Sequence, residues 1–166
     1  MGRFAMISSD ITTCILFQRN LRLSYTMPDR GFAVRVLIVD DTEQWREFLS
    51  TLVTHDAKMV VVGKAVDGFQ SVQYAQQLEP DLILLDIGLP ALNGIEAARQ
   101  IARVSPESKV IFVTQQSDPD VREAALSTGA RGFILKSRAL EELLPAIETV
   151  LAGGIFSRAI SGPSSI

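Results

Sequence analysis

The segment Asp81-Leu-Ile-Leu-Leu-Asp86 constrains the fold more than any other part of this chain. Its four consecutive large aliphatic residues show no alternation of apolar and polar side chains, which is typical of a strand buried on both faces of a parallel sheet. A carboxylate at the end of such a strand needs solvent or a ligand, and open α/β sheets bind ligands at the carboxyl ends of their strands. Asp86 is therefore the first candidate for a functional residue.

Aliphatic strands alternate with amphipathic segments along the chain from Val34 onwards. This alternation predicts βαβ units with right-handed crossovers, and so one doubly wound parallel sheet of five strands in a three-layer α/β/α domain. The predicted strands are residues 34–39, 59–66, 82–85, 109–114 and 132–135. The predicted helices are residues 42–54, 67–78, 93–104, 118–128 and 139–152.

Local signals support the helix boundaries. Asp67, Asn93 and Asp118 are predicted N-caps, and Pro119 follows Asp118 at the first helical position. Pro145 conflicts with the last helix because proline removes a backbone hydrogen bond, so we expect an irregular first turn or a bend there.

Charge and composition limit the possible functions. Residues 1–33 carry four Arg and two Asp, whereas the rest carries 12 Lys or Arg against 17 Asp or Glu. An acidic folded part argues against direct nucleic-acid contact by this domain. The single cysteine, Cys14, excludes an internal disulfide and fits a reducing compartment. Neither a membrane-spanning segment nor a secretion signal is evident, so we expect a cytoplasmic protein without membrane contact.

The chain divides into three predicted parts. Residues 1–33 show no sustained period, and we expect a disordered or non-native leader, with Met27 as an alternative start. Residues 34–154 form the domain. Residues 155–166 have the composition of a tail or the start of a linker, too short for a helix-turn-helix.

Five polar side chains end four of the predicted strands and should meet at one sheet edge: Asp40, Asp41, Asp86, Thr114 and Lys136. Three neighbouring carboxylates repel one another, and a divalent cation relieves this. Hard oxygen ligands suit Mg²⁺. A carboxylate beside Mg²⁺ is also a competent nucleophile towards phosphorus, and Lys136 and Thr114 can bind the phosphoryl oxygens. The set predicts phosphoryl transfer to an aspartate.

Each of these residues has a simpler explanation when it is considered alone. Asp41 can cap the first helix, and Asp40 and Lys136 can be solvated surface charges. Thr114 can be an ordinary β-branched strand residue. The combination in this chain order is what favours a site.

Residues 34–154 resemble the receiver domain of two-component response regulators, closest in wording to the subfamily with LuxR-type (NarL/FixJ-like) output domains. The resemblance rests on five sequence features: Asp40-Asp41, Asp86-Ile-Gly-Leu-Pro90, Asn93-Gly94, Thr114 and Gly129-Ala-Arg-Gly-Phe-Ile-Leu-Lys136. It implies a flavodoxin-like sheet with the strand order 2-1-3-4-5. It also implies a signalling module that catalyses only its own phosphoryl transfer and dephosphorylation.

The resemblance also implies a role for each site residue. Asp86 would accept a phosphoryl group from a histidine kinase or phosphotransfer protein. Asp41 would bind Mg²⁺ directly and Asp40 through water, with the Gly88 carbonyl as a further ligand.

Two further residues would carry the switch. Thr114 would move towards the phosphoryl group, and Phe133 would rotate with it. The face formed by the fourth helix, fifth strand and fifth helix would then control a partner, a homodimer contact or an output domain.

Two positions depart from the family pattern. Gln115 stands where the family has a small residue, so it can crowd the phosphoryl pocket or hold a water there. Gly88 has no side chain to shield or position a hydrolytic water. An alternative is therefore a phosphate-independent receiver that acts as a protein-binding module.

Two other functions fit the sequence poorly. A small-molecule phosphohydrolase of the haloacid dehalogenase type needs an aspartate two residues after its nucleophile, where this chain has Thr42 or Gly88. A flavin-binding protein of the same fold needs a phosphate loop rich in Ser, Thr and Gly after the first strand, and no such loop follows Val39 in this chain.

Overall fold

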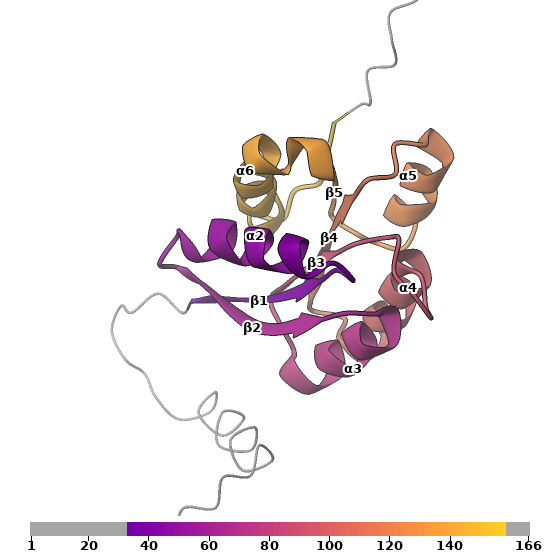
Figure 1. The fold of residues 1–166 in the computed structure, drawn as a ribbon, viewed down its shortest axis with the longest axis horizontal. Coiled ribbons are helices and arrows are strands. Elements are labelled where there is room, and N and C mark those ends of the chain that lie inside the picture. The colour runs from indigo at the N-terminus through magenta and orange to yellow at the C-terminus, as the bar shows by residue number, and fades with distance from the viewer. Residues whose placement is uncertain (1–32, 159–166) are drawn as a thin grey trace, which may run out of the picture. The chain divides into compact units, whose positions relative to one another are not determined.

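The computed structural model describes residues 33–158, which form one six-stranded parallel sheet flanked by helices (Figure 1). The strand order is β2-β1-β3-β4-β5-β6, so the predicted order 2-1-3-4-5 is confirmed and one strand is added at the edge. The strands are β1 (Val34–Val39), β2 (Met59–Ala65), β3 (Leu82–Leu85), β4 (Lys109–Thr114), β5 (Gly132–Leu135) and β6 (Phe156–Ser157). The helices are α2 (Glu43–Thr54), α3 (Gly68–Leu78), α4 (Gly94–Val104), α5 (Pro119–Leu126) and α6 (Ala139–Leu151), and a 3₁₀ turn, η2 (Lys136–Arg138), precedes α6.

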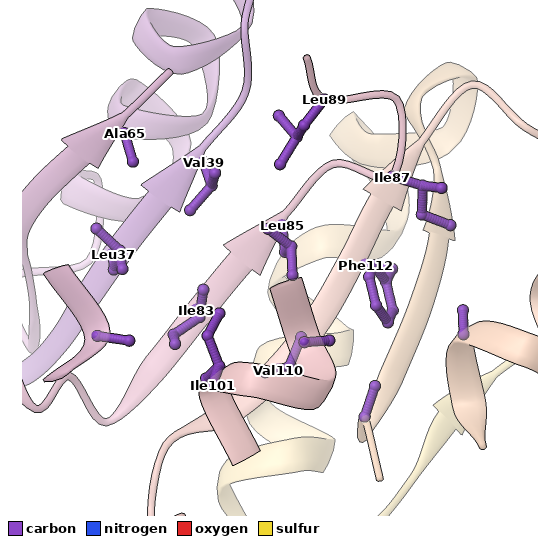
Figure 2. Close-up of a cluster of buried hydrophobic side chains, with 14 of the residues drawn as sticks. Leu37, Val39, Ala65, Ile83, Leu85, Ile87, Leu89, Ile101, Val110 and Phe112 are labelled. Carbon is purple, nitrogen blue, oxygen red and sulfur yellow. The ribbon is translucent and has the colours of Figure 1, made fainter. Parts of the chain in front are cut away.

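Two apolar cores fill the spaces between the sheet and its two helical layers. On one face, Val36, Ile38 and other strand residues pack with residues of α2 and α6. On the other, alternate residues of the same strands pack with α3, α4 and α5, as the cluster around Ile83 and Phe112 in Figure 2 shows. Successive strand residues point to opposite faces, and both faces are covered, which explains why β3 is aliphatic at every position.

The predicted caps are present. The side chains of Asp67, Asn93 and Asp118 accept hydrogen bonds from the backbone N–H groups of Gln70, Glu96 and Asp120. Pro145 lies inside α6, which is assigned as a continuous helix from Ala139 to Leu151, so the expected irregular turn or bend at this proline stays a prediction. Thr42, rather than Asp41, occupies the N-cap position of α2, and its side chain makes no capping hydrogen bond.

A sixth strand lies within the segment 155–166 that was predicted to be a tail or the start of a linker, and residues 159–166 lie outside the described residues. Phe156 and Ser157 pair in parallel with Gly132 and Phe133 of β5. The backbone N–H of Phe156 donates to the carbonyl of Arg131 at 2.8 Å. The exposed backbone edge of β5 offers hydrogen-bond partners to any extended segment. Phe156 also packs against the α6 core.

Side chains of both neighbouring helices hold this segment. Arg122 of α5 donates through Nη2 and Nε to the Ser157 hydroxyl at 2.6 and 2.9 Å. Arg158 lies 3.5 Å from the carboxylate of Glu142 on α6. The segment 156–158 therefore contacts α5, β5 and α6 together.

The leader predicted for residues 1–33 lies almost entirely outside the described residues. Among residues 33–158, no helix is long and apolar enough to span a membrane.

Gly94 allows α4 to begin directly against the backbone of the candidate nucleophile. Its N–H donates to the carbonyl of Ile87 at 2.9 Å. A β-carbon at this position would lie 2.0 Å from the carbonyl oxygen of Asp86, so any larger residue must displace the loop that holds Asp86.

Replacing Gly94 by Ala should therefore lower the free energy of unfolding by about 2 kcal/mol or more, because the added methyl group overlaps backbone atoms that cannot move independently. Gly88→Ala is the matched control, since a β-carbon there meets its nearest atoms at 3.8 and 4.0 Å. Its unfolding free energy should stay within about 0.5 kcal/mol of the wild-type value. Urea unfolding followed by circular dichroism measures both, and equal values for the two variants would contradict the close approach.

Candidate functional site

The carboxyl ends of four neighbouring strands bring the predicted site residues together. Asp40 follows β1, Asp86 follows β3, and Thr114 ends β4, while Lys136 follows β5. Asp40, Asp86, Thr114 and Lys136 are each no more than 6 % exposed. The interpretation of Asp40 and Lys136 as solvated surface charges is thus wrong, because both residues are buried at the ends of their strands.

Lys136 is the electrostatic centre of this group. Its Nζ donates a hydrogen bond to Asp86 Oδ2 at 3.0 Å and lies 2.5 Å from Asp40 Oδ2. The centre of the Trp45 ring is 5.1 Å from the same nitrogen. The ammonium therefore joins the ends of β1 and β3 to the end of β5.

Asp40 is held by its backbone and by one of its two carboxylate oxygens. Oδ1 accepts a hydrogen bond from the Thr42 N–H at 2.9 Å, and the main-chain carbonyl accepts one from Arg46 at 2.8 Å. Oδ2 has an ion pair with Lys136 but no hydrogen bond to any residue that the structure describes. Burial raises the pKa of Asp40 above its ordinary value, and this effect outweighs the attraction of Lys136 and the Thr42 hydrogen bond.

Asp86 accepts two hydrogen bonds that aim its carboxylate away from the sheet. Oδ1 accepts the N–H of Gly88 at 3.3 Å, and Oδ2 accepts Lys136. Its own N–H donates to the carbonyl of Val39 at 3.0 Å, which continues the β1–β3 pairing up to the site. Oδ1 thus faces the loop that contains Gly88, and Oδ2 faces Lys136.

Asp41 is exposed, and it completes a triad of carboxylates with Asp40 and Asp86. One oxygen from each of the three residues lies within 4.8 Å of the others. The ammonium of Lys136 forms ion pairs with Asp40 and Asp86, which leaves the cluster with an excess of negative charge, and two of the three carboxylates are buried. Both observations fit a divalent cation with hard oxygen ligands, such as Mg²⁺.

Thr114 ends β4, and Phe133 lies within the neighbouring strand β5, opposite Phe112. Thr114 pairs with Leu135 of β5, and its Oγ1 accepts the N–H of Gln116 at 3.3 Å, so the hydroxyl hydrogen remains available to a ligand. Phe133 is 4 % exposed and belongs to the core that faces α5. Because phenylalanine has no hydroxyl to solvate at the surface, an inward ring is the expected state.

Gln115 is exposed, so the expectation that it crowds the phosphoryl pocket stays a prediction. The neighbouring Gln116 lies closer to the Gly88 side of the site, since its Nε2 is 4.0 Å from where a β-carbon on Gly88 would be.

Sequence reasoning missed the contact between Trp45 and Lys136. Trp45 is a half-buried residue on the apolar stripe of α2, as expected, but the strand order had to be known before its ring could be placed near Lys136. Arg46, which holds the Asp40 carbonyl, was missed for the same reason.

Comparisons with known proteins agree with this geometry. Residues 36–148 match the family model described as the response regulator receiver domain. The chain is 35% identical over 120 residues to the response regulator GacA of Pseudomonas viridiflava, covering 72% of this chain and 56% of that protein.

Two solved structures have the same fold. A two-component response regulator of the LuxR family from Aurantimonas sp. SI85-9A1 superimposes with a TM-score of 0.72 at 30% identity, covering 75% of this chain and 89% of that one. A chain of the CheX-CheY-BeF3-Mg+2 complex from Borrelia burgdorferi superimposes with a TM-score of 0.66 at 25% identity, covering 73% and 91%.

The chain belongs to the receiver domain family of two-component response regulators. Such domains are phosphorylation-switched signalling modules rather than classical enzymes. The chain spans little more than half the length of the curated relatives that it matches.

The pKa of Asp40 leads to a pH-dependent prediction for the metal-free protein. A raised pKa in the folded state means that the stability contributed by Asp40 is full below its unfolded value of 3.8 and is lost as the pH rises through the folded value. Asp40→Asn, which carries no charge to bury, should therefore melt at a higher temperature than the wild type at pH 7 in EDTA. The difference should shrink towards pH 4.

Calorimetry at several pH values measures this effect. Asp41→Asn removes the same charge from an exposed position and serves as the control for net charge. A lower melting temperature for Asp40→Asn at pH 7 would mean that the ion pair with Lys136 outweighs the cost of burial.

Proposed function

We propose that Asp86 is the phosphoacceptor of this receiver and takes its phosphoryl group from a histidine kinase or a phosphotransfer protein. One observation carries the proposal: the Asp86 carboxylate ends a buried strand, with Lys136 3.0 Å away on one side and two further carboxylates on the other. This arrangement supplies a nucleophile, a fixed positive charge and a set of cation ligands in one place.

Each site residue has a role in the proposed transfer. Lys136 neutralises charge on the phosphoryl oxygens, and Thr114 donates its hydroxyl hydrogen to one of them. Asp41, Asp86 and the carbonyl of Gly88 would hold Mg²⁺ directly, with Asp40 acting through water. Bound Mg²⁺ supplies charge neutralisation for the transferred group.

A phosphate-independent binding module is less favoured. It would gain nothing from three clustered carboxylates, of which those of Asp40 and Asp86 are buried. Such groups cost stability unless a ligand satisfies them. Saturable binding of beryllofluoride with Mg²⁺ would exclude this alternative.

The proposed output face consists of α5, β5 and α6, which correspond to the fourth helix, fifth strand and fifth helix of the predicted domain. Phosphorylation adds about −1.5 to −2 charge near Lys136. Thr114 can reach that group only by moving, and its partner in the sheet is Leu135 of β5. We propose that this cytoplasmic module thereby controls a partner protein, a homodimer contact or the output segment of a longer regulator.

Asp86→Asn should abolish phosphate incorporation from acetyl phosphate while leaving the circular dichroism spectrum unchanged, because asparagine retains the shape of aspartate without its nucleophilic oxygen. Labelling should fall to background. Asp41→Ala keeps the nucleophile and should lose labelling only when Mg²⁺ is limiting. Undiminished labelling of Asp86→Asn would overturn the assignment.

Beryllofluoride and Mg²⁺ should change amide hydrogen exchange mainly between Thr114 and Leu151 and in residues 156–157, since β6 pairs with β5 beside Phe133. Asp86→Asn treated in the same way is the control and should show no such change. Changes confined to α2 and α3 would place the output on another face.

A further inference from the structure

Trp45, in the first turn of α2, presents its ring to the ammonium of Lys136. The ring centre lies 5.1 Å from Nζ, and the lysine side chain is 5 % exposed. Cations are attracted to the electron-rich faces of aromatic rings, most strongly to indole, and the attraction grows when the cation is shielded from water. The ammonium therefore has three close neighbours in the site: the carboxylates of Asp40 and Asp86 and the indole of Trp45.

These three neighbours respond differently to phosphoryl transfer. Asp86, which accepts the lysine hydrogen bond through Oδ2, becomes an acyl phosphate and loses its carboxylate charge. Asp40, whose Oδ2 forms an ion pair with Lys136, belongs to the carboxylate cluster that a cation would neutralise. The indole carries no charge and forms no bond in the reaction. Its contact with Lys136 is the one attraction of the three that the chemistry leaves unaltered.

We infer that Trp45 is a positioning residue, which holds the ammonium of Lys136 beside Asp86 while its two carboxylate partners change; this inference rests on the proposed function. In the transfer step an Asp86 oxygen forms the new bond to phosphorus as the bond between phosphorus and the donor atom breaks; that atom is a histidine nitrogen in the partner protein and an acyl oxygen in acetyl phosphate. The leaving group departs with that electron pair. Lys136 keeps its proton throughout and contributes only charge, so its location decides its effect.

A purely structural role for Trp45 is the competing explanation. The ring packs edge-on against Phe48, with centroids 5.2 Å apart and planes at 89°, and it lies against the core beneath α2. If apolar volume were all that mattered, leucine or methionine would replace tryptophan as well as phenylalanine does. Only the inferred role requires an aromatic face.

The first experiment compares Trp45→Phe, Trp45→Leu and Trp45→Met by the initial rate of phosphorylation from acetyl phosphate at saturating Mg²⁺. Rates are corrected for the folded fraction, and methionine provides a second apolar variant if leucine prevents folding. We expect the apolar variants to lose roughly fivefold or more in rate and phenylalanine to recover most of it. Phe48→Leu is the packing control and should lower the melting temperature without a comparable loss of rate.

The second experiment observes the contact itself by NMR. The ε-methylene protons of Lys136 should be shifted upfield by the ring current of Trp45, and the shift should vanish in Trp45→Leu. It should persist after beryllofluoride and Mg²⁺ are added. If the upfield shift disappears when beryllofluoride and Mg²⁺ are added, the ring does not hold the ammonium in the phosphorylated form.

The outcomes separate this inference from the proposed function. A wild-type protein that takes up no phosphate contradicts the proposed function. A wild type that is phosphorylated while all three Trp45 variants react equally fast contradicts only the role of Trp45.

Discussion

The buried ammonium of Lys136 is the interaction on which the site depends. It lies 2.5 Å from Asp40 and 3.0 Å from Asp86, so it joins loops that follow three different strands. None of these loops is close to the others in the sequence, and only the parallel arrangement of β1, β3 and β5 brings them together. The apolar sheet holds the strand ends in place, and the ion pairs of Lys136 with Asp40 and Asp86 connect the residues that follow β1, β3 and β5.

This arrangement is costly for the metal-free protein. The pKa of Asp40 is raised because burial outweighs the attraction of the Lys136 ammonium and the Thr42 hydrogen bond. Natural proteins commonly lose stability at functional sites in exchange for activity. A site with excess negative charge favours the binding of a cation. In the proposed transfer the same cation would also neutralise charge on the phosphoryl group, so cation binding and phosphoryl transfer would be linked.

Local sequence signals predicted most of the fold and the residues of the site. Each of these signals depends on neighbours within a few positions, so it can be recognised from the sequence alone. They are the aliphatic run of β3, the N-caps and the polar residues at the strand ends. The strand β6 could not be predicted, because two residues carry too little pattern and their partner is the backbone of β5. The contact between Trp45 and Lys136 was missed because 91 residues separate them along the chain.

The direction of β6 has a consequence for the path of the chain. Because Phe156 and Ser157 run parallel to β5, beside Gly132 and Phe133, the chain at this edge of the sheet points in the same direction as the other strands. An antiparallel edge strand would have sent it to the opposite end of the domain. The short β5–β6 pairing, together with the contacts of Ser157 with Arg122 and of Arg158 with Glu142, therefore fixes both the position and the direction of the chain beside α5 and α6.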